Sequence, residues 1–199
     1  MSFTALYFLG LLFAEGLRLP QRVRRAGSKD RGNKPGSSRT AEWLVLVAVA
    51  LGMWLLPAMY ALTPALRPFD YGLPAWMACV GCAVFAVSLA LRLAAQLTLS
   101  RSWSHTLETT QEQVLVQHGV YGISRHPLYV SLIFWALAQP ALLQNGLAGF
   151  GGAVAVALIW LVRVPREEQL MLDTFGEDYR RYMTRTGKVV TLRREQRDG

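Results

Sequence analysis

The sequence predicts an all-α integral membrane protein of five transmembrane helices, with the N-terminus outside and the C-terminus inside. Three observations predict this fold class. Of 199 residues, 52% are hydrophobic and only 17% are charged, against about 25% charged in a typical soluble domain. Long apolar runs follow one another along the chain. The basic residues, which leave a net charge of +8, gather between those runs.

The apolar segments are long enough to be read as helical spans. A helix rises about 1.5 Å per residue, so about 20 apolar residues cross the hydrocarbon core. The run at 41–62 carries one charge, Glu42, and the weakest run is the opening segment, which Glu15 and Arg18 interrupt. The opening segment lacks a basic start and a small-residue cleavage site, so we expect a span there and not a cleaved signal peptide. The predicted spans are 2–19, 41–62, 73–93, 128–143 and 146–163. The tight turn signal Gln144-Asn145-Gly146 makes the last two a hairpin.

The positions of the basic residues predict the orientation. From Arg18 to Arg39 the chain holds eight Lys or Arg and one acid, in a loop that should stay in the cytoplasm. With five spans, 20 of the 21 basic residues fall inside and only Arg67 falls outside. Topology and attraction to anionic membrane lipid therefore explain the positive charge. No nucleic-acid partner is expected.

The cysteine content narrows the class of protein, and the arginine content indicates its source. Two cysteines exclude a disulfide scaffold. Cys79 and Cys82 have no His or carboxylate neighbours at metal-ligand spacing, so no metal site is expected. Arginine outnumbers lysine 18 to 3, which fits a GC-rich bacterial source, and a bacterial inner membrane is the expected location. Residues 1–199 are expected to form a single domain.

A first polar segment precedes the fourth span. Val114–Val116 is a short β-branched piece. Pro127 suits the first turn of a helix, because its missing N–H would be unpaired there anyway. His126 then lies where free N–H groups and the positive end of the helix dipole face the cytoplasm. Tyr129 follows one turn later, near the same face.

A second polar segment follows the fifth span, which ends at Arg163. Pro165 is predicted to restart the helix, with Glu167 and Glu168 in its first turn, and Gly176 to mark a bend in an amphipathic C-terminal helix. Arg163 and Glu167 are four residues apart, so a continuous helix would place them on one face. Snorkelling arginines and helix-dipole complementation explain each charge singly. Several ionisable and aromatic groups at one depth on three elements favour a functional site.

These two segments carry a family resemblance. RHPLY at 125–129, an apolar hairpin, REE at 166–168 and FGEDYRRYM at 175–183 resemble the signature of the isoprenylcysteine carboxyl methyltransferases. That signature is usually written RHPxYxG, a hinge and a Glu-Glu pair. The similarity covers about residues 88–190, and the five-span layout is similar to that of short prokaryotic members. Ser131 replaces the usual glycine of the motif, and Asn145-Gly146 stands where Asn-Pro is common.

The resemblance implies a cytoplasmic pocket for S-adenosylmethionine within a catalytic region at about 91–190. Arg163 matches the arginine that meets the substrate carboxylate, so Arg163 and Glu167 are the implied catalytic residues. Arg92, at the inner end of the third span, is a further candidate for binding substrate. The implied cofactor-binding residues are Glu108, Gln113, Val114, Leu115, Val116, Tyr121, His126, Pro127, Leu128, Tyr129 and Glu167.

The implied reaction is attack of an acceptor carboxylate on the sulfonium methyl group, giving a methyl ester. The acceptor is a prenylcysteine-like or other lipophilic acid that enters from the lipid. Its carboxylate is ionised at neutral pH, so no general base is needed. The enzyme would supply position, water exclusion and charge placement. Arg163 would hold the acceptor bidentately, and Glu167 would bind the cofactor's amino group or orient Arg163.

Two alternatives stay open. The first is a phospholipid N-methyltransferase acting on an ethanolamine-type amine, which must lose a proton before it attacks. His126 is the only candidate for that base. The second is a non-catalytic membrane protein that binds lipid and does not bind S-adenosylmethionine.

Overall fold

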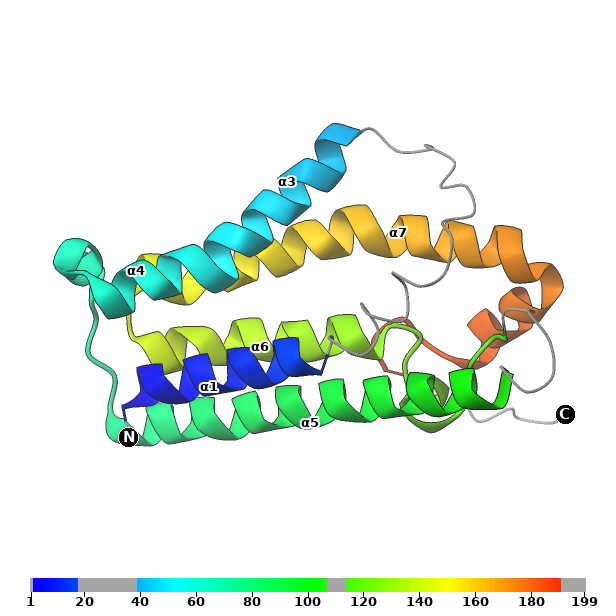
Figure 1. The fold of residues 1–199 in the computed structure, drawn as a ribbon, viewed down its shortest axis with the longest axis horizontal. Helices are drawn as coiled ribbons and strands as arrows, with labels where there is room; N and C mark the ends of the chain where they lie inside the picture. The colour runs from blue at the N-terminus through cyan, green and yellow to red at the C-terminus, as the bar shows by residue number, and fades with distance from the viewer. Residues whose placement is uncertain (1, 18–38, 107–113, 191–199) are drawn as a thin grey trace, which may run out of the picture.

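The computed structural model describes residues 2–17, 39–106 and 114–190, which are nearly all helical. The helices run along one long axis and form an elongated bundle (Figure 1). The elements are α1 (Phe3–Gly16), α3 (Arg39–Val49), the π-helix η1 (Ala50–Leu55), α4 (Leu56–Leu62), the 3-10 helix η2 (Pro64–Phe69), α5 (Ala75–Thr106), the 3-10 helix η3 (Gly119–Gly122), α6 (Pro127–Leu143) and α7 (Gly146–Arg185).

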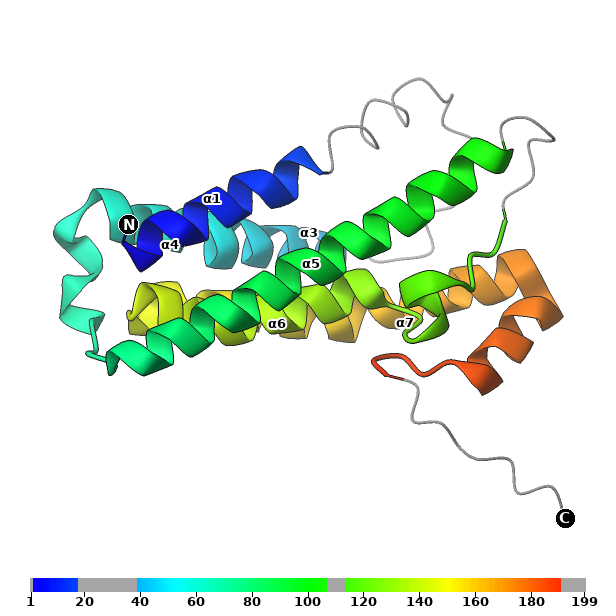
Figure 2. The ribbon, with the colours of Figure 1, turned by 90° about the horizontal axis from the view of Figure 1, so that it is seen from below.

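Helix α6 is the centre of the bundle, since it packs against both α5 and α7. Helix α1 packs against α5 and α6. The consecutive helices α3, η1 and α4, which we call the α3–α4 rod, lie along α7. Figure 2 shows α5 crossing α6 and diverging from it toward its C-terminal end. The core is aromatic where α1, α5 and α6 meet. The ring centroid of Trp135 lies 4.6 Å from that of Phe85 and 5.7 Å from that of Tyr7.

The predicted turn at Gln144-Asn145-Gly146 is confirmed, and it joins α6 and α7 into a helical hairpin. Gln144 takes a left-handed conformation with φ 50°. Asn145 is fully buried, and its Oδ1 accepts from the backbone N–H groups of Leu147 and Ala148. Its Nδ2 donates to the carbonyl of Leu66 over 2.6 Å. Asn145 therefore both caps α7 and fixes η2 to the turn.

The connections sort to two ends of the bundle (Figure 1). The start of α1, η2 and the α6–α7 turn lie at one end. The end of α5, η3 and the last part of α7 lie toward the other, and α3 begins on that side of the bundle's middle. Every described segment predicted to be cytoplasmic therefore lies toward the second end.

Among the described residues, three helices have the length and composition of a membrane span, namely Thr40–Leu62, Ala75–Ser100 and Gly146–Arg185. Helices α1 and α6 are apolar but have 14 and 17 residues, or about 21 and 26 Å. Helix α7 has 40 residues, but its backbone is non-helical at Gly176, so its uninterrupted part, residues 146–175, is about 45 Å long, longer than the hydrocarbon thickness of about 30 Å. The polar residues of α7 begin after Arg163.

One local prediction was wrong, and one helix is longer than the predicted span. Helix α7 does not restart at Pro165, so Glu167 and Glu168 lie within a continuous helix. A proline inside a long helix is tolerated where small local adjustments satisfy the carbonyl that it frees. Helix α5 begins at Ala75 and continues to Thr106, past the predicted span at 73–93. The β-branched piece at 114–116 lies in a segment, 114–117, that has no regular secondary structure.

One bend was predicted correctly. Gly176 has φ 53° and ψ −122° and joins two helical parts of α7. These angles suit glycine alone, and they turn the last part of α7 back across the end of the bundle (Figure 2).

A polar contact in the apolar part of the bundle fixes the α3–α4 rod. Gly52, in η1, approaches α7 so closely that a Cβ there would lie 2.1 Å from the Gly151 carbonyl oxygen. Gln139 donates from Nε2 to the Gly52 carbonyl over 2.8 Å, and the Tyr7 hydroxyl donates to the Met53 carbonyl over 2.8 Å. Side chains from α6 and α1 thus satisfy carbonyls in the π-helical turn, as buried backbone groups require.

Candidate active site

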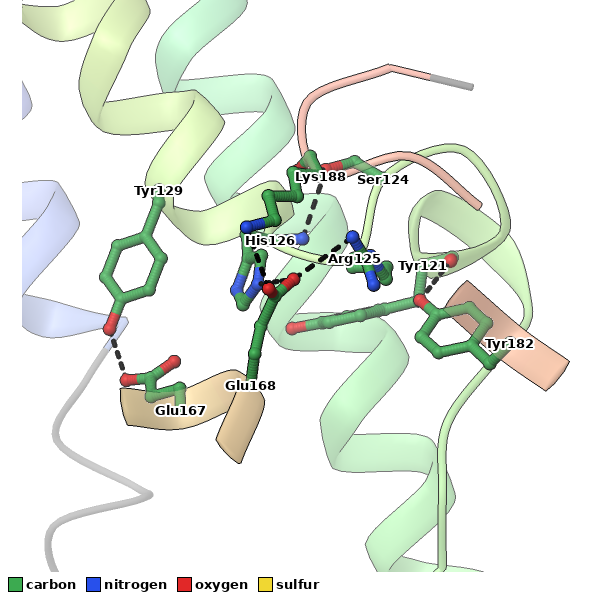
Figure 3. Close-up of polar contacts among 9 residues, drawn as sticks. All are labelled: Tyr121, Ser124, Arg125, His126, Tyr129, Glu167, Glu168, Tyr182 and Lys188. Carbon is green, nitrogen blue, oxygen red and sulfur yellow. Dashed lines mark hydrogen bonds and ion pairs between the residues drawn. The ribbon is translucent and has the colours of Figure 1, made fainter. Parts of the chain in front are cut away.

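The two polar segments singled out in the sequence meet where the N-terminal end of α6 packs against α7. Figure 3 shows His126 and Tyr129 facing the glutamates at 167 and 168. His126 precedes the first residue of α6 and is buried. Its backbone N–H donates to the Ser124 hydroxyl over 3.1 Å. The turn before α6 therefore presents the imidazole to α7.

Glu168 is the centre of this site. Its buried carboxylate accepts from Arg125 Nη2 at 3.1 Å, His126 Nε2 at 3.3 Å and Lys188 Nζ at 2.9 Å. We call these four residues the Glu168 cluster. Burial raises the pKa of Glu168, but its three donors together outweigh burial and hold the pKa below its ordinary value. The carboxylate is therefore ionised at neutral pH.

The Glu168 cluster also holds the chain that follows α7. The backbone N–H of Arg125 donates to the Gly187 carbonyl over 2.9 Å, and the Ser124 hydroxyl donates to the Lys188 carbonyl over 2.8 Å. The cluster thus joins the segment before α6, the middle of α7 and the segment after α7.

His126 is neutral in this setting. Burial lowers its pKa, and the neighbouring Glu168 offsets only part of that shift. Because Nε2 faces the carboxylate, we assign the proton to Nε2. The imidazole ring lies 5.7 Å from the Tyr129 ring and 6.5 Å from the Trp160 ring, centroid to centroid. His126 is therefore oriented by one hydrogen bond and two aromatic neighbours.

Glu167 has a different partner from Glu168. Its carboxylate accepts a hydrogen bond from the Tyr129 hydroxyl, and the rest of the side chain is exposed. The ring of Tyr121, from η3, points toward the glutamates (Figure 3). Burial raises the pKa of Tyr121 above its ordinary value, and Tyr182 and Glu167 add to that shift. Tyr121 therefore keeps its proton and can donate.

Arg163 lies near this site but has a partner on another helix. Its Nη2 is 3.3 Å from Glu42 Oε2, and Arg166 Nη1 is 2.8 Å from Glu42 Oε1. Tyr129 lies within electrostatic reach of Arg163, Glu42 and Glu167. Arg163 and Glu167 lie four residues apart on one continuous helix as predicted, but their partners differ, because Glu167 faces α6 and Arg163 faces α3.

The structure brings together only part of the predicted set. Tyr121, His126, Tyr129 and Glu167 converge, with Arg163 beside them. Pro127 is buried and Leu128 half-buried in the first turn of α6. Val114 is 59% exposed, and Leu115 and Val116 are half-buried in an irregular segment. Glu108 and Gln113 lie outside the described residues.

Arg92 is 4% exposed and lies within the bundle on α5, so its guanidinium does not snorkel to the lipid surface. A depression of about 370 Å³ lies nearby, between α5 and η3. It is lined by Ala94, Leu97, Thr98, His118, Gly119 and Val120. None of the predicted site residues lines this depression.

The family motif, carried over residue by residue, assigned no role to Glu168, although Glu168 is the second residue of the motif's Glu-Glu pair. Arg125 was also left out. Its side chain is 7% exposed, and in the part of the chain that the structure describes its Nε and Nη1 have no hydrogen-bond partner. Buried donors of this kind suit an anionic group. The exposed face of the Glu167 carboxylate suits a cation.

The described residues contain no group of three or more His, Cys, Asp or Glu side chains that could hold a metal ion. Apolar helices of spanning length and an ionic cluster at one end of the bundle define a helical integral membrane protein with a polar site at the end of its helices.

Comparison with known proteins gives the family. The model of the isoprenylcysteine carboxyl methyltransferase family matches residues 79–173. Protein-S-isoprenylcysteine O-methyltransferase B of Arabidopsis thaliana is 29% identical over 169 residues, which cover 76% of this chain and 86% of the relative. The A protein of that plant is 31% identical over 146 residues, which cover 67% and 74%. The chain therefore belongs to the isoprenylcysteine carboxyl methyltransferase family and is an enzyme similar to the protein-S-isoprenylcysteine O-methyltransferases.

A solved structure shares the fold. It is the eukaryotic intramembrane Ras methyltransferase, an isoprenylcysteine carboxyl methyltransferase, and it superposes with a TM-score of 0.57 at 24% sequence identity. The superposition covers 94% of this chain and 65% of the solved chain. This chain therefore has an isoprenylcysteine carboxyl methyltransferase-like fold in less than two thirds of the length of that relative.

Proposed function

We propose that this enzyme transfers a methyl group from S-adenosylmethionine to the carboxylate of a prenylcysteine-like or other lipophilic acid. The observation that carries the proposal is the double connection between the two halves of the family motif. Tyr129 bonds to Glu167, and His126 lies 3.3 Å from Glu168. Arg163, the proposed acceptor-binding residue, lies beside them.

The residues present fit S-adenosylmethionine, which carries an ammonium, a sulfonium and a carboxylate. Glu167 offers a carboxylate with an exposed face to the cationic groups. Arg125 offers two buried donors to the carboxylate. When bound, the cofactor supplies a methyl group on positively charged sulfur. The remaining residues proposed to hold it are Glu108, Gln113, Val114, Leu115, Val116, Tyr121, His126, Pro127, Leu128 and Tyr129.

The roles of the chain's own residues follow from charge. The acceptor carboxylate is ionised at neutral pH and needs no base. Arg163 holds the acceptor carboxylate bidentately, and one carboxylate oxygen forms the new C–O bond with the methyl group as the bond between that methyl group and sulfur breaks. An anion and a cation become a neutral ester and a neutral thioether, so a site of low dielectric constant favours the reaction. With no proton to transfer, His126 is not needed as a base, and its proposed role is in cofactor binding.

The membrane arrangement belongs to the same proposal. It has five spans, with the N-terminus outside, the C-terminus inside, and residues 1–199 as one domain in a bacterial inner membrane. Its support is that the end of α5 and the last part of α7 lie toward the same end of the bundle as the site, and that α3 begins on that side of the bundle's middle. Arg92, within the bundle, is proposed to lie on the path of the acceptor from the lipid.

The test is methyl transfer by the purified protein in lipid nanodiscs. Labelled S-adenosylmethionine is supplied with N-acetyl-S-farnesylcysteine or with phosphatidylethanolamine. Label in a base-labile ester of the first acceptor is expected. Label in a stable amine would replace the proposal with phospholipid N-methylation. Transfer to neither acceptor, with no heat of binding for S-adenosylmethionine, would make the protein a non-catalytic lipid binder.

A further inference from the structure

Glu42 is the one charged residue in the predicted span at 41–62, and it holds two arginines of α7. One carboxylate oxygen pairs with Arg163 at 3.3 Å and the other with Arg166 at 2.8 Å. The pairs join residues 121 and 124 positions apart in the chain. The first turn of α3 is therefore attached to α7 by a single carboxylate, which two guanidinium groups share.

Another carboxylate can replace Glu42 in its contact with Arg163. The side chains of Glu42, Arg163 and Arg166 are 37%, 32% and 34% exposed. Pairs with this much exposure are weak, because water and salt screen them. The pair with Arg163 is also the longer one. A second carboxylate that reaches Arg163 can therefore replace Glu42 there while Glu42 stays on Arg166.

The proposed acceptor brings such a carboxylate. It needs the guanidinium of Arg163, which Glu42 now partly neutralises and which lies beside the bond between Tyr129 and Glu167. The product does not need one, because a methyl ester carries no charge. Substrate and product therefore differ in whether they can compete with Glu42 for Arg163.

We infer that Glu42 is a specificity-determining residue that stands in for the acceptor carboxylate, an inference that rests on the proposed function. Before the acceptor binds, Glu42 neutralises Arg163. An anionic acceptor displaces it from Arg163 and leaves it on Arg166. Once the ester has formed, Glu42 returns to Arg163 and the neutral product leaves. The exchange rejects uncharged lipids, which cannot compete, and speeds release of the ester.

Two substitutions test this in opposite directions, with N-acetyl-S-farnesylcysteine as the acceptor. Glu42→Gln removes the competing charge, so its KM for the acceptor should fall about 2–5-fold, the change expected for a weak ion pair. Inhibition by the methyl ester should strengthen by a similar factor. Arg166→Gln leaves Glu42 with Arg163 alone, so KM should rise. Glu177→Gln, which removes an exposed pair with Arg180 on the same helix, is the control and should change neither value.

The outcomes separate this inference from the proposed function. If wild-type protein transfers no methyl group to this acceptor, the proposed function fails first. If wild-type protein is active and Glu42→Gln leaves KM unchanged, or raises KM and lowers kcat, only the role of Glu42 is overturned. A raised KM with a lowered kcat would mean that Glu42 positions Arg163 for catalysis. Should Glu42→Gln not fold, Arg166→Gln still decides, because a KM that does not rise contradicts competition.

Discussion

The Tyr129 hydroxyl on α6 donates a hydrogen bond to the Glu167 carboxylate on α7, 38 residues further along the chain. His126, three residues before Tyr129, makes the neighbouring contact with Glu168. One turn at the start of α6 is thus matched to two adjacent residues of α7. The relative positions of the two helices therefore set the geometry of the site, and the turn capped by Asn145 sets those positions at the far end of the bundle.

Removing the Tyr129 hydroxyl should weaken cofactor binding. In Tyr129→Phe, Glu167 loses its donor and is free to turn away from the site. We expect the Kd for S-adenosylmethionine to rise about 3–10-fold, which is the contribution of one typical hydrogen bond. Isothermal titration calorimetry measures it. Tyr71→Phe, which loses a hydrogen bond to the Pro140 carbonyl at the other end of the bundle, should leave the Kd unchanged. Equal effects of the two variants would place Glu167 outside the cofactor site.

Arg163 should act on the acceptor and not on the cofactor. Arg163→Ala removes the cation for the acceptor carboxylate, so we expect methyl transfer to fall about 100-fold, as for lost positioning of a reactant. Titration calorimetry should show a Kd for S-adenosylmethionine close to that of the wild type. Arg180→Ala, which changes an exposed arginine further along α7, should retain activity. Parallel loss of transfer and cofactor binding would contradict the role given to Arg163.

Glu168 should matter for stability more than any exposed acid. Glu168→Gln leaves the buried guanidinium of Arg125 without its counter-charge, and breaking such a buried pair costs about 3–5 kcal/mol. The ammonium group of Lys188 is half exposed, so water would solvate it in place of Glu168. The Tm in detergent should fall by about 6 °C or more. Glu177→Gln, whose carboxylate pairs with Arg180 at the surface, should shift Tm by less than about 2 °C. Similar shifts in both variants would mean that the Glu168 cluster contributes little to folding.

The helices and the hairpin were predictable because their signals are local. Uninterrupted apolar runs marked the helices, and Gln144-Asn145-Gly146 marked the turn. The length of α5 was not predictable in this way, because α5 continues past its apolar part as a polar helix to Thr106. Pro165 misled for a related reason, since a proline signals a helix boundary only where the surrounding helix cannot adjust.

The site was less predictable, because its contacts are set by how α7 is rotated. Glu167 and Glu168 are neighbours in sequence, yet one meets Tyr129 and the other is buried among Arg125, His126 and Lys188. A motif says that two glutamates belong to the site but not which partner each takes. The pairing of Glu42 with Arg163 spans 121 residues, and no local pattern indicates it.

The stability of the folded protein should fall as the pH drops below about 6.5. Burial lowers the pKa of His126 in the folded state, whereas in the unfolded chain it is about 6.5. Below that pH the unfolded chain binds a proton that the folded protein does not, so folding becomes less favourable. Glu168 adds to the loss at lower pH, because its folded pKa is depressed and its stabilisation disappears as the pH falls through that value.

Thermal unfolding at pH 7.5, 6.5 and 5.5 measures this effect. The wild-type Tm should fall across the series, and the fall should be smaller in His126→Gln than in the wild type. His118→Gln removes an exposed histidine and should leave the slope as it is. An unchanged slope in His126→Gln would mean that another group carries the dependence on pH.

The contact of η1 with α7 should not tolerate a methyl group. In Gly52→Ala the new Cβ would lie 2.1 Å from the Gly151 carbonyl oxygen, and that oxygen is backbone that cannot rotate away. The rod must move outward, which weakens the hydrogen bonds that Gln139 and Tyr7 make to its carbonyls. Overpacking of this kind costs about 1–3 kcal/mol. Gly16→Ala adds a methyl group with nothing within 4 Å, so its Tm should match or exceed that of the wild type. Equal Tm values for the two variants would show that the rod and α7 can separate at no measurable cost in stability.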